Sequence, residues 1–393
     1  MFIILFYHNL LKKNDSFKEF YLKKMIRSII TGTGHYLPKN IIKSNHFLKY
    51  VFYDQKGLKI EKSNEEIINK FQKITEIEER RYINNSLLNS DIATIAAKRA
   101  LNNSKIYKEE IDYIISAHNY GDINPISFQS DLMPSIAARV KNKLEIKNKK
   151  CRPYDMIFGC TGWIEGMILA DQLLQAKYAK NILITSSETL SKAIDPHDRN
   201  SMIFSDGAGA AVLSSIEIEE ENLGIIYYDT QCNNNEELHY LNNGPSLNPS
   251  YKKSLVNIRM NGRRIYEYAL TEVPIMLKRI LDHANLHLKD IKKILIHQAN
   301  AKMDYAILKR LLKLYNYNNA KTKDFCKKLM PMTIQKYGNS SVATVPTLLD
   351  LILQKRMLPH EIHPGDTILM ASLGAGMNIN GMIYRFPKKK HYE

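Results

Sequence analysis

The 393-residue sequence lacks an uninterrupted run of about 18 apolar residues, the minimum that a transmembrane helix needs. It has few cysteines, and they show neither CxxC spacing nor paired histidine clusters. These features argue against a disulfide scaffold and a structural zinc site, and they favour a reducing cytoplasm. The cysteines are Cys151, Cys160, Cys232 and Cys326.

The sequence also lacks an acidic balance, since 56 Lys and Arg residues against 40 Asp and Glu residues give a net charge of +16. Such an excess invites a nucleic-acid hypothesis, but the basic residues are scattered and form no basic face interleaved with aromatics. The charge therefore favours an acidic partner only weakly. An apolar fraction of 44% is typical of a globular chain, and the length suits one large α/β enzyme or two ordinary domains.

Residues 1–24 begin with an apolar stretch that has no basic region before it and no small-residue cleavage site after it. This pattern argues against a secretory signal. Met25 is followed by IRSIITGTGHYLP, which predicts a buried first strand and a turn at its glycines. We therefore expect the fold to begin near Met25, with residues 1–24 as a loosely attached extension or a mis-called start.

Apolar strand-like runs alternate with helical segments along the chain. In the first set, predicted strands at 111–118, 154–160 and 182–188 are each followed by a helical segment, the last at 207–215. A polar, Asn-rich stretch at 231–250 is expected at the surface. A second, similar set follows it, with a strand at 292–299 between two helices and a strand pair near the C-terminus. The pattern predicts an α/β fold with two related halves, 25–222 and 223–388, in five layers.

Cys160 stands where a predicted strand runs through Gly159 into a helix starting at Thr161. A thiol at a helix N-terminus faces free N–H groups and the positive end of the helix dipole, which stabilise a thiolate. This placement predicts a nucleophile, although a buried structural cysteine is the alternative.

Three further features follow in the order histidine, asparagine and glycine turn. His297 ends a strand, where α/β sheets open onto ligands, although a packing histidine also fits. Asn339 follows Gly338 in a predicted turn, where an asparagine often serves only as a structural cap of the backbone. The turn at 373–376 can bring a main-chain N–H against a substrate oxygen. Together with Cys160, these features indicate an acyl-transfer site.

The segments FGCTGW, IHQAN, YGNSS, FSDGAGAAVL and SLGAG resemble the signatures of β-ketoacyl-acyl-carrier-protein synthase III, a member of the thiolase superfamily. The resemblance extends from Met25 to Phe386. It implies a duplicated αβαβα five-layered sandwich, a homodimer, and a decarboxylative condensation with malonyl-acyl-carrier protein that initiates fatty acid biosynthesis. It implies no cofactor, since acyl-CoA or acyl-carrier protein and malonyl-acyl-carrier protein are the substrates.

The resemblance also implies roles for individual residues. Cys160 matches the acylated nucleophile, and His297 and Asn339 match the pair that receives the malonyl thioester carbonyl. The backbone N–H groups of Cys160 and Ala375 match the oxyanion hole. Met133 matches a residue that reaches across the dimer to the partner's acyl channel, although a core methionine is the alternative. The remaining assignments are Leu190 in the acyl pocket and Arg199, Lys302, Lys309 and Arg310 in carrier or coenzyme A binding.

The basic residues after His297 have a simpler explanation as well, because Lys302, Lys309 and Lys313 recur at offsets of 7 and 11 and share one helix face. A solvated basic face would give the same pattern as a docking surface for acyl carrier protein.

Some positions depart from the family pattern. Arg199 matches one half of the usual coenzyme A clamp, but Lys70 stands near the usual tryptophan and Ile74 near a second arginine, while Trp163 adjoins the nucleophile. The acyl donor is therefore coenzyme A held by a different clamp, or a carrier protein. Segments 118–133 and 297–339 are longer than the family norm and are predicted to be surface insertions.

Other functions fit the sequence less well. A related condensing enzyme for dialkylresorcinol or polyene lipids is the alternative. A biosynthetic thiolase would carry a second cysteine in the turn at 373–376, and a papain-like protease would lack the strand and helix alternation.

Overall fold

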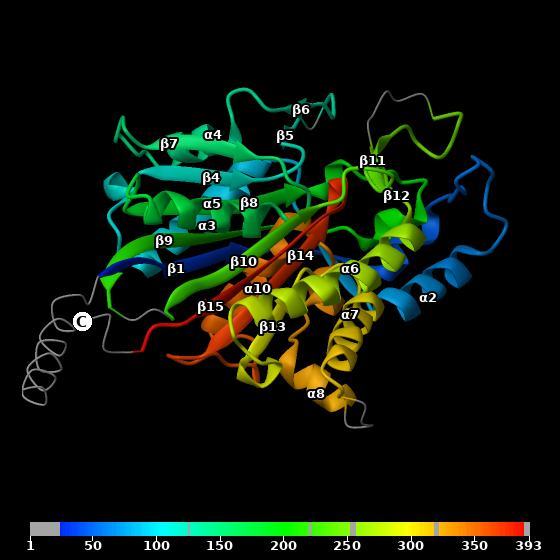
Figure 1. The fold of residues 1–393 in the computed structure, drawn as a ribbon. Helices are drawn as coiled ribbons and strands as arrows, with labels where there is room; N and C mark the ends of the chain where they lie inside the picture. The colour runs from blue at the N-terminus through cyan, green and yellow to red at the C-terminus, as the bar shows by residue number, and fades with distance from the viewer. Residues whose placement is uncertain (1–23, 125, 220–221, 252–256, 318–321, 389–393) are drawn as a thin grey trace, which may run out of the picture.

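The computed structural model describes residues 24–124, 126–219, 222–251, 257–317 and 322–388. Of the predicted extension at 1–24, all but Lys24 lies outside the described residues. Two β-sheets organise the rest of the chain, and their strands pass side by side through the centre of the molecule (Figure 1).

The larger sheet has five strands in the order β1-β9-β8-β4-β7. Strand β9 pairs antiparallel with β1 and β8, whereas β4 pairs parallel with β8 and β7. Strand β7 therefore stands at an edge. The strand bounds are β1 (Met25–Tyr36), β4 (Tyr113–Ala117), β7 (Arg152–Met156), β8 (Asn181–Thr189) and β9 (Asp206–Ile218).

The smaller sheet has the order β10-β15-β14-β13, with β13 parallel to β14 and the other pairs antiparallel. All strands of the larger sheet come from residues 25–218 and all strands of the smaller one from residues 224–385. The bounds are β10 (Gly224–Cys232), β13 (Lys293–Ile296), β14 (Thr367–Gly374) and β15 (Asn378–Arg385).

Helices form three further layers. Helices α3 (Asn89–Ser104) and α4 (Ile136–Lys143) cover the outer face of the larger sheet, and α6 (Gly262–His283) and α7 (Ala301–Leu314) lie outside the smaller one. Helices α5 (Gly162–Gln175) and α10 (Thr344–Leu353) contact both sheets and so form the central layer. Since they pack on sheets from both sides, they are apolar around most of their circumference. The predicted five-layered, thiolase-like sandwich is confirmed.

The first strand is longer than the sequence suggests. The glycines that were expected to form a turn, Gly32 and Gly34, lie within β1. A Cβ atom on Gly32 would lie 2.2 Å from the carbonyl oxygen of Ala100 in α3, and one on Gly34 would lie 2.4 Å from that of Ala96. These glycines therefore allow close packing between helix and strand instead of ending the strand.

The helical segment predicted at 207–215 is wrong, because these residues belong to strand β9. The strand is rich in glycine and alanine because helices pack closely on it: a Cβ atom on Gly209 would lie 2.5 Å from Pro346 of α10. Buried on both faces, β9 shows no alternation of polar and apolar residues.

Short elements lie around this core. Helix α2 (Asn64–Thr75) packs on α7, and the predicted insertion at 118–133 forms a hairpin whose exposed end projects from the molecule (Figure 1). No described helix is both long and apolar enough to cross a membrane. The other short elements are β2 (Asn40–Lys43), β3 (Glu79–Tyr82), β5 (Asp122–Ile123), β6 (Ser130–Asp131), β11 (Leu241–Gly244), β12 (Asn257–Met260), α8 (Thr322–Leu329) and α9 (Ile334–Tyr337).

Candidate active site

A cavity of about 470 Å³ opens at the end of the molecule where α2, α6 and α7 meet. Its lining includes Cys160, His297 and Asn339, which lie far apart in the sequence. Apolar side chains, among them Phe204 and Leu373, line much of the remaining wall. The structure thus brings together the three reactive side chains that the sequence singles out.

Cys160 lies just beyond the end of β7 and just before α5. Strand β7 ends at Met156, so the expected strand does not continue to Gly159. Gly159 has a φ of 60°, and a Cβ atom there would lie 2.6 Å from the backbone nitrogen of Ala375. Glycine meets both demands, the left-handed backbone and the close approach. Thr161 is the N-cap of α5, which places the thiol at a helix N-terminus as predicted.

The protein encloses the thiol more than the sequence suggests. Burial raises the pKa of Cys160 to about 11, while a hydrogen bond from the Ser341 hydroxyl to Sγ, 3.1 Å long, acts in the opposite direction. Burial thus favours the thiol form, whereas the hydrogen bond from Ser341 and the helix N-terminus favour the thiolate. When Cys160 loses its proton, the hydrogen bond from the Ser341 hydroxyl can stabilise the resulting thiolate.

His297 directly follows β13, and its N–H donates to the Ala371 carbonyl at 2.8 Å, which continues the pairing with β14. Nδ1 lies 2.7 Å from the Thr344 hydroxyl. Burial lowers the pKa of His297 to about 4, so the ring is neutral at pH 7. The Thr344 hydroxyl also lies 3.1 Å from the Ser341 carbonyl oxygen, and its single hydrogen can serve only one of the two acceptors. If it donates to Nδ1 of His297, the ring proton sits on Nε2; if it donates to Ser341, the ring proton sits on Nδ1.

Asn339 is fixed at both its backbone and its side chain. Its N–H donates to the Ile203 carbonyl at 3.0 Å, and its carbonyl accepts from the N–H of Ser205 at 2.8 Å. The N–H of Ser341 donates to Oδ1 at 2.8 Å. Because the side-chain oxygen is engaged, the amide nitrogen is the group that Asn339 can offer as a donor.

The glycine turn after β14 packs directly against Cys160. A Cβ atom on Gly374 would lie 2.3 Å from the backbone nitrogen of Cys160. The Ser372 hydroxyl donates to the Cys160 carbonyl at 2.9 Å, which holds the backbone of the nucleophile in place. The backbone nitrogens of Cys160 and Ala375 are thereby brought close together, as the predicted oxyanion hole requires.

The cavity mouth carries a strong positive charge. Arg199 and Lys302, both predicted to bind the carrier or coenzyme A, line the cavity. Lys70 and Ile74 of α2 also line it, at the two positions where this sequence departs from the usual coenzyme A clamp. Trp163 is buried in the central core, 1% exposed, and does not substitute for the missing clamp residue. The other charged residues at the mouth are Lys62, Glu66 and Arg263.

The two residues predicted for the acyl pocket do not line this cavity. Leu190 is buried in a cluster with Ile203 and Phe204, which do line it, so Leu190 lies behind the cavity wall. Met133 is 86% exposed, which excludes the alternative of a core methionine within this chain.

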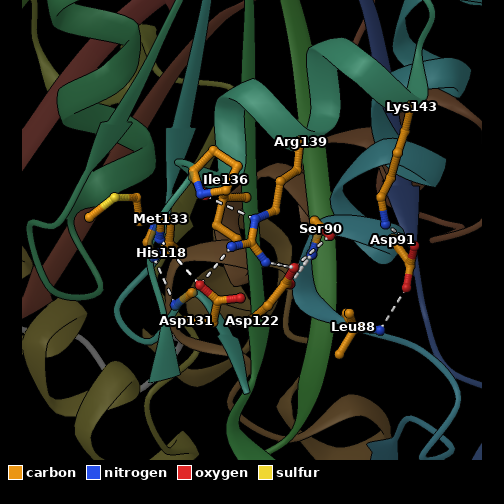
Figure 2. Close-up of polar contacts among 12 residues, drawn as sticks. Leu88, Ser90, Asp91, His118, Asp122, Asp131, Met133, Ile136, Arg139 and Lys143 are labelled. Atoms are coloured by element: carbon orange, nitrogen blue, oxygen red, sulfur yellow. Dashed lines mark hydrogen bonds and ion pairs between the residues drawn. The ribbon is translucent and has the colours of Figure 1, made fainter. Parts of the chain in front are cut away.

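The loop that carries Met133 is held by an ion-pair cluster (Figure 2). Arg139 of α4 contacts Asp122 at 2.7 Å and Asp131 at 2.8 Å. Asp122 also accepts from the backbone and hydroxyl of Ser90. Figure 2 shows the Met133 side chain directed away from this cluster. Met133 is therefore presented outward on an anchored loop.

The basic residues of α7 are exposed. Lys302, Lys309, Arg310 and Lys313 all face solvent, and Lys302 also reaches the cavity mouth. Arg310 donates to the Leu270 carbonyl of α6 at 3.0 Å and is thus less free than the lysines.

Four polar residues around the reactive side chains were missed by the sequence reasoning: Asn119, Glu188, Ser341 and Thr344. Ser341 lies inside the quoted YGNSS segment but received no role. Glu188 was detectable as a carboxylate at the end of an apolar strand, since such a group is rarely buried without a purpose. Among the described residues, no cluster of three His, Cys, Asp or Glu side chains is placed to hold a metal ion.

Two sheets around central helices, with Cys, His and Asn meeting in one cavity, define a thiolase-like condensing enzyme. Sequence comparison matches residues 154–234 to the 3-oxoacyl-[acyl-carrier-protein] synthase III model and residues 281–386 to its C-terminal model. The chain belongs to the β-ketoacyl-acyl-carrier-protein synthase III family.

Individual relatives agree with this assignment. A β-ketoacyl-acyl-carrier-protein synthase III from Clostridium perfringens is 33% identical over 353 residues, covering 88% of this chain and 96% of the relative. A solved structure of the synthase III from Aquifex aeolicus has a TM-score of 0.72 at 28% identity and covers 91% of this chain and all of that one. The priming β-ketosynthase of the R1128 polyketide pathway, at 21% identity and a TM-score of 0.73 over 93% and 98% of the two chains, shares the fold.

Proposed function

We propose that this chain condenses an acyl group bound to Cys160 with malonyl-acyl-carrier protein, giving β-ketoacyl-acyl-carrier protein and initiating fatty acid biosynthesis. The observation that carries the proposal is the single cavity lined by Cys160, His297 and Asn339. Its family membership, at 33% identity to a named synthase III, supports the same reaction.

The first half-reaction is an acyl transfer. The Cys160 thiolate attacks an acyl thioester, the carbon–sulfur bond to the carrier breaks, and the carrier leaves as a thiol. The tetrahedral oxyanion accepts hydrogen bonds from the backbone N–H groups of Cys160 and Ala375. Gly159 and Gly374 make this possible, because side chains there would force the two backbones apart.

The second half-reaction starts from malonyl-acyl-carrier protein. Loss of CO₂ supplies the carbanion, so this step needs no metal or redox cofactor; it needs only donors for the enolate oxygen. The Asn339 amide supplies one. Neutral His297 supplies the other through Nε2–H in the tautomer in which the Thr344 hydroxyl donates to Nδ1 and not to the Ser341 carbonyl. Each such donor is typically worth about 10²-fold or more in rate. The carbanion then attacks the acyl-Cys160 carbonyl.

The charged mouth supports a phosphate-bearing carrier. Arg199 and Lys302 would pair with the phosphate of a pantetheine arm, which both coenzyme A and acyl carrier protein possess. Lys70, in place of an aromatic clamp, offers charge instead of a stacking surface for an adenine ring. The exposed row on α7 with Lys309 and Arg310 would dock the acidic carrier protein, chiefly by speeding association.

A homodimer completes this proposal. Strand β7 is an edge of the larger sheet, with no further strand paired to it among the described residues, and apolar side chains are exposed on it and on the adjoining loop. A second copy placed along β7 would cover these side chains and bring Met133 toward the partner's acyl channel. The exposed residues are Ile126, Met133, Tyr154 and Ile157. Free thiols on all four cysteines suit a reducing cytoplasm.

The test is to incubate the protein with a panel of acyl-CoA and acyl-carrier thioesters and to weigh it intact by mass spectrometry. A stable acyl adduct that disappears in Cys160→Ala, and that malonyl-acyl-carrier protein converts to a β-keto product, is the expected result. An adduct that persists in Cys160→Ala would rule out Cys160 as the nucleophile. The acyl groups and carriers that load would also identify the donor.

A further inference from the structure

Behind Cys160 runs a line of three polar side chains from three separate elements. Ser341, in the short helical turn after Asn339, donates to Cys160 Sγ at 3.1 Å. Asn119, just beyond β4, places its amide nitrogen 3.2 Å from the Ser341 hydroxyl oxygen. The same nitrogen donates to Oε1 of Glu188, which is fully buried near the end of β8.

The donors and acceptors in this line run in one direction, because the amide nitrogen of Asn119 donates to Oε1 of Glu188. Oε1 can accept this hydrogen bond both when Glu188 is ionised and when its proton sits on the other carboxyl oxygen. An amide nitrogen carries two hydrogens, and the second one points to Ser341. Because the Ser341 oxygen then accepts from Asn119, its single hydrogen is left for Cys160 Sγ.

We propose that Glu188 and Asn119 are positioning residues that hold the Ser341 hydroxyl as a hydrogen-bond donor to Cys160, and that this donor stabilises the thiolate that is acylated. The role of Cys160 as nucleophile rests on the proposed function. The transfer balances as acyl–S–carrier plus Cys160–SH giving acyl–S–Cys160 plus carrier–SH. The thiol proton passes through the cavity solvent to the departing sulfur.

The unusual backbone of Ser341 agrees with this role. Its φ of 51° is left-handed, an uncommon conformation for a residue other than glycine. This conformation lets one residue serve two reactive groups, with its hydroxyl at Cys160 and its N–H at Asn339. Replacing only the hydroxyl leaves the contact with Asn339 in place.

Glu188 acts through its hydrogen bond and not through its charge. Burial raises the pKa of Glu188 to about 8, and the hydrogen bonds from Asn119 oppose this shift. A negative charge on Glu188 raises the pKa of the Cys160 thiol, which would hinder thiolate formation. Only the orientation that Glu188 imposes on Asn119 and Ser341 favours the thiolate.

The experiment measures the rate at which iodoacetamide alkylates Cys160 as a function of pH, with the label quantified on the Cys160 peptide by mass spectrometry. All variants carry Cys232→Ser, since Cys232 is an exposed thiol. The variants are Ser341→Ala, Asn119→Ala and Glu188→Gln. Ser340→Ala is the matched control, because the Ser340 hydroxyl has no hydrogen-bond partner among the described residues. Thermal unfolding confirms that each variant is folded.

Ser341→Ala should raise the apparent pKa of alkylation by about one unit, a loss of about tenfold in rate below that pKa. Asn119→Ala should shift it in the same direction by less. Glu188→Gln, which keeps an oxygen that can accept from Asn119 but removes the charge, should not raise it. Ser340→Ala should match the parent.

The inference is overturned if folded Ser341→Ala or Asn119→Ala keeps the parent pH profile, or if Glu188→Gln raises the pKa as much as Ser341→Ala. Alkylation requires no substrate, so this result is separate from the proposed condensation. A parent protein that fails to form an acyl adduct would refute the proposed function, whereas an unshifted Ser341→Ala would refute only the positioning role.

Discussion

Gly374→Ala tests the oxyanion hole with one methyl group. Gly374 has a φ of −164°, an extended conformation that alanine also adopts, so the substitution adds no backbone strain. The new Cβ atom, however, would lie 2.3 Å from the Cys160 backbone nitrogen and 3.1 Å from its Cα. The atoms that it meets are backbone atoms, which cannot rotate away. The turn itself therefore has to move.

The size of the effect follows from these distances. An ordinary contact begins near 3.4 Å, so the turn would retreat by about 1.1 Å from Cys160. A misplacement of about 1 Å can cost about 10²-fold in rate. Because the acyl transfer and the condensation both pass through an oxyanion in this hole, both steps should slow by about 10²-fold. Rapid quenching followed by intact mass spectrometry measures the first step, and product formation measures the second.

Gly365→Ala provides the control, since Gly365 has a φ of 87° and lies beyond the cavity lining. Alanine there should lower the free energy of unfolding by about 1 kcal/mol through backbone strain while leaving the acylation rate unchanged. If folded Gly374→Ala acylates as fast as the parent, the turn does not form the oxyanion hole and the mechanism proposed for both steps is incorrect.

Three further predictions concern the proposed roles. His297→Ala and Asn339→Ala should still accept an acyl group on Cys160, but the rate of malonyl decarboxylation should fall by about 10²-fold or more. Release of CO₂ measures this rate. A folded variant that cannot be acylated would contradict the assignment of these two residues to decarboxylation alone. Met133→Phe should shorten the longest acyl group that loads, and an unchanged chain-length profile would count against a boundary role. Charge reversal at Lys309 and Arg310 should raise the KM for malonyl-acyl-carrier protein, more at low salt, without affecting acylation by a small carrier-free thioester; equal loss with both substrates would remove the docking assignment.

Much of the fold could be predicted because the strands and helices are distinct in hydrophobic pattern. The two helices expected on either side of the strand at 292–299 are α6 and α7, and the strand pair near the C-terminus is β14 and β15. Strand β9 could not be predicted, because it is buried on both faces and the helices that pack on it leave room only for small side chains. The glycines of β1 were misread for the same reason. In both cases close helix packing selects small residues that resemble a turn or a helix.

That Cys160, His297 and Asn339 lie together could be predicted, because each stands in a short, specific segment. Their supporting residues could not, since the line from Glu188 to Cys160 joins residues that no sequence pattern connects. The raised pKa of the Cys160 thiol was missed for a related reason. Position at a helix N-terminus is readable from the sequence, whereas the amount of protein that surrounds the sulfur depends on the whole fold.

The contact between the glycine turn and the nucleophile also has a consequence for the chain as it is being made. Ser372, which holds the Cys160 carbonyl, is 212 residues away from it in sequence. A ribosome therefore releases the reactive cysteine long before it has synthesised the turn that completes the site. Until the last strands emerge and join the smaller sheet, a partly made chain has the thiol but lacks the turn that the proposed oxyanion hole requires. On the proposed mechanism, the cysteine becomes an acyl acceptor only when nearly the whole protein has been made.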